Sequence, residues 1–167
     1  MRVPKKRRGE SRTDYAKRLK LLKSGKPRIV FRKSNRFLTG QYVISSEAQD
    51  KVFITVSSKE LLKNGWDETK INSLKTLPAS YLTGMLLAKK IKEKKLDKKV
   101  IIDFGMIRNL HKTKGYAFLK GLIDAGMDIS YSEKKDLFPS EERLLGKHLK
   151  QDVSKNVQEI KSKLLSK

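Results

Sequence analysis

The sequence predicts an α/β fold in which helices pack on the faces of a mixed five-stranded sheet, with a basic N-terminal extension and a helical C-terminal tail. Three observations favour it. Three β-rich segments with short polar connections come first, as in antiparallel strands. Helical and extended segments then alternate, the order that gives parallel strands. Lysine and arginine concentrate at both ends, so we divide the chain into residues 1–26, 27–132 and 133–167.

Positive charge dominates the N-terminal extension. Residues 1–36 contain fifteen Lys and Arg against two acids, Glu10 and Asp14, and so carry +13 of the formal net charge of +22. Packing like charges together costs Coulomb energy, so this segment needs a polyanion beside it. A sequence pI near 10.2 agrees with a nucleic-acid partner.

A short helix is predicted within this extension, over residues 12–22. Thr13 is a suitable N-cap, and Gly25 can supply the left-handed residue that ends a helix. Tyr15 lies on one face of the helix with two leucines, so it is available either for packing or for stacking on a base.

The first three strands form a predicted antiparallel meander, over residues 28–34, 41–44 and 51–56. In the first of them Arg28 and Arg32 share one face, while Ile29 and Phe31 take the opposite face and point to the core. The segment from Ser57 to Glu60 has the sequence of a capping box, and Gly65 ends the short helix that follows.

The remainder of the core alternates helix and strand. Residues 77–94 predict a long helix with Pro78 in its first turn, and residues 100–104 form an apolar run typical of a buried parallel strand. A second helix is expected over residues 116–125, ended by Gly126, and residues 127–131 provide a fifth strand.

The C-terminal tail is predicted to contain two helices. Ser140 can cap the first, and two glutamates follow at its positive end. Residues 152–165 carry apolar side chains at helical spacing, which indicates an amphipathic helix. Its apolar face needs a surface, either the protein's own core or a partner.

Composition excludes several function classes. The absence of cysteine excludes disulfides and cysteine-based zinc sites. No apolar run approaches the roughly 18 residues of a membrane-spanning helix, and no signal-peptide core follows the basic start. Histidine pairs with metal-ligand spacing and nucleotide-binding loops are also missing. We therefore expect a cytoplasmic protein that is not an enzyme, holds no metal or other cofactor and does not act at a membrane.

Two alternatives stay open beside RNA binding. A mixed sheet that begins with a meander resembles the ribonuclease H architecture, whose clustered carboxylates hold two magnesium ions. Here the first strand offers arginines instead, and Asp103 has no evident carboxylate partner, which disfavours a metal-dependent nuclease. The third hypothesis is a basic protein that compacts DNA.

The candidate RNA-binding residues are basic side chains interleaved with polar and aromatic ones. Guanidinium groups fork onto phosphates, and amides reach sugar hydroxyls or exposed bases. The residues fall in the leader, in and just after the first strand, at the start of the second strand and in the loop after Asp103: Arg2, Lys5, Lys6, Arg7, Arg8, Arg12, Tyr15, Arg18, Lys26, Arg28, Arg32, Ser34, Asn35, Arg36, Gln41, Arg108, Asn109, Lys112 and Lys114.

Several strings of residues resemble one known family in a single order along the chain. They include Arg12-Thr13-Asp14-Tyr15, Leu77-Pro78-Ala79-Ser80-Tyr81-Leu82-Thr83-Gly84, Ile102-Asp103-Phe104-Gly105, Gly121-Leu122-Ile123-Asp124-Ala125-Gly126 and Phe138-Pro139-Ser140-Glu141-Glu142-Arg143. Together they resemble the L-eighteen family of large-subunit ribosomal proteins, in particular its archaeal members. Gly9 departs from the family's pattern, which tends to have a basic residue there.

This resemblance implies a ribonuclease-H-like fold of the translational-component type, without catalysis. It also implies binding to 5S ribosomal RNA and its attachment to the large-subunit RNA of the 23S type in the central protuberance. The partners expected from it are these two RNAs and the neighbouring 5S-binding ribosomal protein. A homo-oligomer is not expected.

Overall fold

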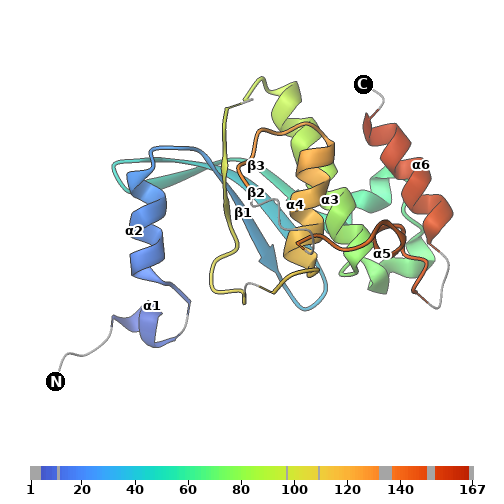
Figure 1. The fold of residues 1–167 in the computed structure, drawn as a ribbon, viewed down its shortest axis with the longest axis horizontal. Coiled ribbons are helices and arrows are strands. Elements are labelled where there is room, and N and C mark those ends of the chain that lie inside the picture. The colour runs from blue at the N-terminus through green and yellow to red at the C-terminus, as the bar shows by residue number, and fades with distance from the viewer. Residues whose placement is uncertain are drawn as a thin grey trace.

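A four-stranded mixed sheet with two helices packed on one of its faces forms the centre of the computed structural model (Figure 1). The structure describes residues 5–10, 12–96, 98–108, 110–131, 137–149 and 153–165. The strands are β1 (Arg28–Lys33), β2 (Leu38–Ser46), β3 (Gln49–Ser57) and β4 (Ile101–Asp103). The helices are α1 (Lys6–Gly9), α2 (Tyr15–Lys23), α3 (Leu77–Glu93), α4 (Lys114–Asp124), α5 (Glu141–Leu145) and α6 (Ser154–Leu165), with 3-10 turns η1 (Ser58–Asn64) and η2 (Glu68–Ser73) between β3 and α3.

The strand order β3-β2-β1-β4 confirms the predicted meander and the mixed character of the sheet. β1 pairs antiparallel with β2, placing Ile29 opposite Tyr42, and parallel with β4, placing Ile29 beside Ile102. Phe31 and Ile29 are both buried, as their alternation with the arginines predicted. β1 therefore has one core-facing side and one polar side.

The prediction of a fifth strand is wrong, because the sheet has four strands and residues 127–131 are not one of them. Residues 127–131 make only one isolated parallel bridge, between Val100 and Ile129. The apolar alternation that predicted the strand is present, since Met127 and Ile129 are buried. What the strand lacks is a partner of matching length, because β4 has only three residues.

Most of the short-range signals are confirmed. The Ser57 capping box is present in full, and Gly65 ends η1 in the left-handed conformation. α3 begins at Leu77 with Pro78 in its first turn. The N-cap of α2 is Asp14, one residue after the predicted Thr13, because the Asp14 carboxylate accepts the N–H groups of Ala16 and Lys17.

The C-terminal tail belongs to the core. Val157, Ile160 and Leu164 of α6 are buried and join the same hydrophobic cluster as α3 and the sheet. α6 lies beside α3, at the opposite end of the molecule from α2 (Figure 1). The amphipathic face predicted from the sequence thus finds its surface on the protein itself.

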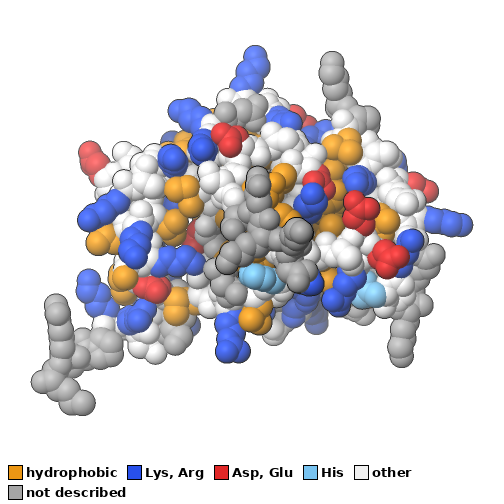
Figure 2. Space-filling view, in the orientation of Figure 1, with side chains coloured by type: hydrophobic (Ala, Val, Ile, Leu, Met, Phe, Trp, Pro, Cys, Tyr) orange, Lys and Arg blue, Asp and Glu red, His pale blue; other side chains and the backbone are white. Residues whose placement is uncertain are grey.

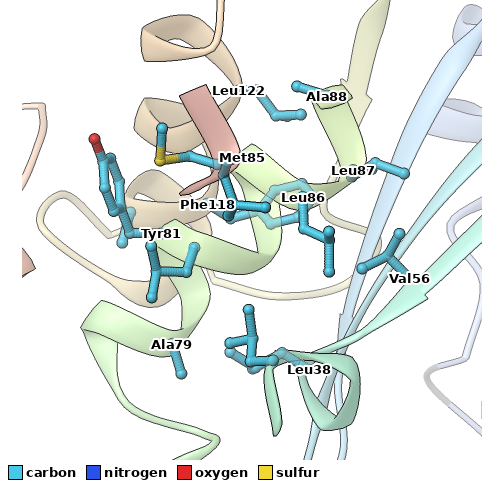
Figure 3. Packing of buried hydrophobic residues seen from close by; sticks show 14 of the residues in the cluster. Leu38, Val56, Ala79, Tyr81, Met85, Leu86, Leu87, Ala88, Phe118 and Leu122 are labelled. Atoms are coloured by element: carbon cyan, nitrogen blue, oxygen red, sulfur yellow. The ribbon is translucent and has the colours of Figure 1, made fainter. Parts of the chain in front are cut away.

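α3 and α4 approach each other closely enough for their backbones to touch. A Cβ atom built on Gly84 of α3 would lie 2.3 Å from the carbonyl oxygen of Phe118, and one on Gly121 of α4 would lie 2.1 Å from that of Tyr81. Leu122, Met85 and Phe118 interdigitate around this contact (Figure 3). The Tyr81 hydroxyl also donates to Asp124 at 2.8 Å.

α2 is attached to the polar side of the sheet mainly by charge. None of its residues is buried, and Leu19 is 54% exposed. Arg18 of α2 and Arg28 of β1 both bind Asp50, at 2.9 Å and 2.6 Å. Burial opposes ionisation of Asp50, but hydrogen bonds from Ser45 and Arg18 and the charge of Arg28 outweigh it and lower its pKa.

We predict that Gly121→Ala lowers the free energy of unfolding by about 3 kcal/mol, because the new methyl group meets a backbone carbonyl that cannot move alone. Helix propensity alone would give the opposite sign, a gain of up to about 1 kcal/mol. The matched control is Gly9→Ala, where no atom lies within 4 Å of the added Cβ. Denaturant titration measures both variants, and equal stability of the two would refute the close contact.

We predict that Asp50→Asn costs about 2 kcal/mol of stability, because it leaves the buried Arg28 guanidinium without its counter-charge. Since the folded-state pKa of Asp50 is lowered, its stabilisation is present above pH about 4 and is lost as pH falls further. Between pH 7 and pH 2 the melting temperature should therefore fall less steeply in the variant than in the natural chain. Glu10→Gln, which removes only the exposed pair with Arg12, should leave the melts unchanged.

Candidate nucleic-acid interface

Most of the predicted RNA-binding side chains lie on the surface. The exposed ones are Lys5, Lys6, Arg7, Arg8, Arg12, Tyr15, Lys26, Arg32, Ser34, Asn35, Arg36, Arg108 and Lys112. Arg18, Gln41 and Lys114 are half-buried, and Arg2 and Asn109 lie outside the described residues. Basic side chains spread across the face seen in Figure 2, from the α1–α2 end to the α5–α6 end.

Arg28 corrects the expectation of an open arginine face on β1. It points away from the core, as predicted, but its side chain is only 3% exposed. Its guanidinium donates to Ser45 at 2.8 Å and to Asp50 at 2.6 Å. Arg28 therefore serves the fold, and its hydrogen-bonding capacity is directed inward.

Arg32 is a second correction, because it is engaged within the protein while remaining on the surface. Its guanidinium donates to the Asp103 carboxylate at 3.0 Å and to the Asp103 carbonyl at 2.9 Å. The side chain is still 46% exposed. Arg32 thus ties β1 to the end of β4 and keeps one side of its guanidinium toward solvent.

Asp103 organises the loop that follows β4. Its second carboxylate oxygen accepts the Gly105 N–H at 2.7 Å, and Lys17 of α2 donates to the Gly105 carbonyl at 3.0 Å. Burial acts against the charged form of Asp103, yet the Gly105 hydrogen bond and the Arg32 guanidinium hold its pKa below the ordinary value. The carboxylate is therefore a fixed internal counter-charge and not an open metal ligand.

A cavity of about 870 Å³ opens between β1, the start of α3 and the loop that runs from β4 to α4. Its walls include Phe31 and Phe104. Six basic residues from four segments line it: Arg12, Arg32, Lys33, Arg108, Lys112 and Lys114. None of the fifteen lining residues is acidic. The first-strand and loop clusters, which are far apart in the sequence, thus meet around one hollow that also receives Arg12 from the leader.

Three lysines concentrate charge beside this cavity. Burial lowers the pKa of Lys114, and the nearby charges of Lys75 and Lys33 lower it further. Neither Lys33 nor Lys75 was among the residues predicted from the sequence. Lys75 lies outside both basic clusters of the chain, so no local signal marks it, whereas Lys33 stands directly beside Arg32.

The leader is organised by contacts among its own residues. Lys5 lies 4.9 Å from the centre of the Tyr15 ring, and Arg8 pairs with Asp14 at 3.3 Å. Tyr15 is 36% exposed and stays outside the core. The ring is therefore available on the surface, and neither of its two predicted roles, packing beside the leucines of α2 or stacking on a base, is excluded.

The chemistry open to this surface is binding of anions. Within the described part of the chain, no group of three or more His, Asp or Glu side chains is placed to hold a metal ion. No described helix is long and apolar enough to cross a membrane.

Comparison with known proteins identifies the family. The family described as "Ribosomal large subunit proteins 60S L5, and 50S L18" matches residues 1–100. The large ribosomal subunit protein uL18 of Methanococcus maripaludis is 45% identical over 150 residues, which cover 89% of this chain and 74% of that protein. The uL18 protein of Methanothrix thermoacetophila is 38% identical over 168 residues, or 98% of this chain and 95% of that protein.

The uL18 protein of Korarchaeum cryptofilum is a third relative, 40% identical over 148 residues, with 89% of this chain and 72% of that protein covered. These archaeal relatives agree with the resemblance drawn from the sequence and with a protein that is not an enzyme. The chain belongs to the uL18 family of large ribosomal subunit proteins.

Proposed function

We propose that this protein binds 5S ribosomal RNA and attaches it to the 23S-type RNA of the large subunit, in the central protuberance beside the other 5S-binding ribosomal protein. One observation carries the RNA-binding part: among the described residues, six basic ones and no acidic one line a hollow at the meeting point of the leader, β1 and the β4–α4 loop. Membership in a large-subunit ribosomal family supports RNA as the anion.

The proposed surface has two parts. The first is the leader, whose exposed cations from Lys5 to Arg12 suit a strand of phosphates. The second is the surface around the cavity, continued by the exposed residues Ser34, Asn35 and Arg36 after β1. The two parts adjoin at Arg12, which belongs to the leader and also lines the cavity.

Ion pairing within the chain supports this division. Asp14, Asp50 and Asp103 each pair with an arginine, and their side chains are 36%, 31% and 10% exposed. These pairs fix positions of the fold, while most lysines and arginines of the leader and the cavity rim stay exposed. Such a surface gains most from a ligand that replaces many counterions at once.

We expect 5S RNA to bind tightly and with strong salt dependence. If about six phosphates are neutralised, the logarithm of the binding constant should fall against log salt with a slope of roughly −4 to −5. Filter binding between 50 and 400 mM KCl measures the slope, with a DNA duplex of equal length as competitor. Salt-independent binding, or equal affinity for the DNA duplex, would contradict the proposal.

Arg32→Ala should weaken 5S RNA binding by roughly 1–3 kcal/mol, the range for hydrogen bonds to charged groups. Because Arg32 also binds Asp103, we expect the stability to fall by about 1–2 kcal/mol as well. Arg32→Lys should recover only part of the binding, because it keeps the positive charge but an ammonium cannot make the two parallel hydrogen bonds of a guanidinium to phosphate.

The matched control is Arg36→Ala, at an exposed position in the turn after β1. It should weaken RNA binding without changing the melting temperature. RNA titration and thermal melting are read for all three variants. If Arg32→Ala melts earlier but binds RNA with unchanged affinity, Arg32 acts only inside the protein and the β1 surface is not an RNA contact.

A further inference from the structure

We propose that the cavity between β1, α3 and the β4–α4 loop receives one unpaired nucleobase of the bound RNA, splayed out of its stack. This inference rests on the proposed function and adds to it a mode of recognition. A surface that is only basic binds phosphates. This hollow combines cations, which can bind a phosphate, with apolar and aromatic walls, against which a base can pack.

The apolar walls are extensive for a surface that is otherwise so charged. Six side chains of this kind line the cavity: Phe31, Leu77, Phe104, Met106, Ile107 and Leu110. Its volume of about 870 Å³ falls in the usual range of small-ligand sites. A phosphate group needs no apolar wall, so the hollow fits the base and the surrounding cations fit the backbone.

Phe104 provides the surface on which a base can stack. Its ring meets Phe31 edge-on, with centroids 6.1 Å apart, and packs on Tyr116 at 5.8 Å. Phe104 is half-buried and lines the cavity, with the other two rings packed against it. A fixed aromatic face is what single-stranded RNA readers use, because each base has a π-face.

Met106 and Leu110 are the exposed part of the wall. Met106 is 48% exposed and Leu110 is 54% exposed, although the protein has a large core elsewhere. The loop that bears them is pinned, since Asp103 accepts the Gly105 N–H and the Lys112 N–H donates to the Leu137 carbonyl. Exposed apolar side chains on a fixed loop are suited to cover a ligand, and the loop does not have to fold for that.

The charge of the rim identifies the ligand as RNA and not as an apolar side chain of a neighbouring protein. Arg12, Arg32 and Lys114 approach the hollow from different segments, and none of the described residues that line it is acidic. An apolar protein side chain carries no charge to pair with six cations, whereas each nucleotide brings a negatively charged phosphate together with its base. The occupant we propose is therefore a single unpaired nucleotide.

The test separates base contacts from phosphate contacts by their salt dependence. The double variant Met106→Ser/Leu110→Ser keeps every charge and removes the exposed apolar wall. We expect its affinity for 5S RNA to fall at least fivefold while the slope of log K against log salt stays unchanged, since no phosphate contact is lost. The double variant Lys33→Gln/Lys114→Gln should instead flatten that slope, by roughly 0.7–0.9 for each lost phosphate contact.

Ile71→Ser is the matched control, because Ile71 is 43% exposed on η2 and does not line the cavity. A second measurement uses methyl-labelled Met106 in the full-length protein. Its NMR signal should move upfield when 5S RNA binds, because the ring current of a stacked base shields a methyl group above it.

Two results would overturn the inference. In one, Met106→Ser/Leu110→Ser binds RNA as tightly as the natural chain and the Met106 methyl signal does not move, while 5S RNA still binds with a steep salt slope. The base pocket then fails and the proposed function stands. In the other, the natural chain itself shows no salt-dependent binding of 5S RNA, and the proposed function fails together with the pocket.

Discussion

The backbone contact between α3 and α4 is the constraint on which the rest of this structure depends. Gly84 and Gly121 each face a carbonyl oxygen of the other helix, at distances that no Cβ atom can share. Two helices this close act as one layer against the sheet, and Phe118 of α4 packs on Phe31 of β1 at 4.8 Å. α3 begins at Leu77 and α4 at Lys114, and both residues line the basic cavity.

At the edge of the sheet, Asp103 fixes the position of the loop that follows β4. It stands at the end of a short parallel strand, a position that often carries catalytic or metal-binding carboxylates. Here the Asp103 carboxylate accepts hydrogen bonds from Arg32 and from the Gly105 N–H. These bonds hold the start of the loop that carries Met106, Arg108 and Leu110. This strand-end carboxylate therefore holds the loop in place through contacts within the protein.

The highly charged chain contains both paired cations and clusters of like charge. Arg28, the one deeply buried arginine among the described residues, has Asp50 beside it. The lysines around Lys114 show the opposite case, since burial and their mutual repulsion lower its pKa. A protein that holds like charges together stores unfavourable Coulomb energy that a polyanion relieves on binding. This arrangement agrees with a place among RNA-rich ribosomal components.

The sequence by itself determined the order of elements, the mixed sheet, the capping box at Ser57 and the core-facing side of β1, because these follow from local periodicity and capping chemistry. It also determined the basic leader and the family. Only the tertiary structure decided that Arg28 is buried, that Arg32 binds Asp103, that α6 completes the core and that Lys75 joins Lys33 and Lys114. It also decided that residues 127–131 lack a strand partner. These facts depend on contacts between segments far apart in the chain, and side-chain type and spacing carry no record of which acid a given arginine will meet.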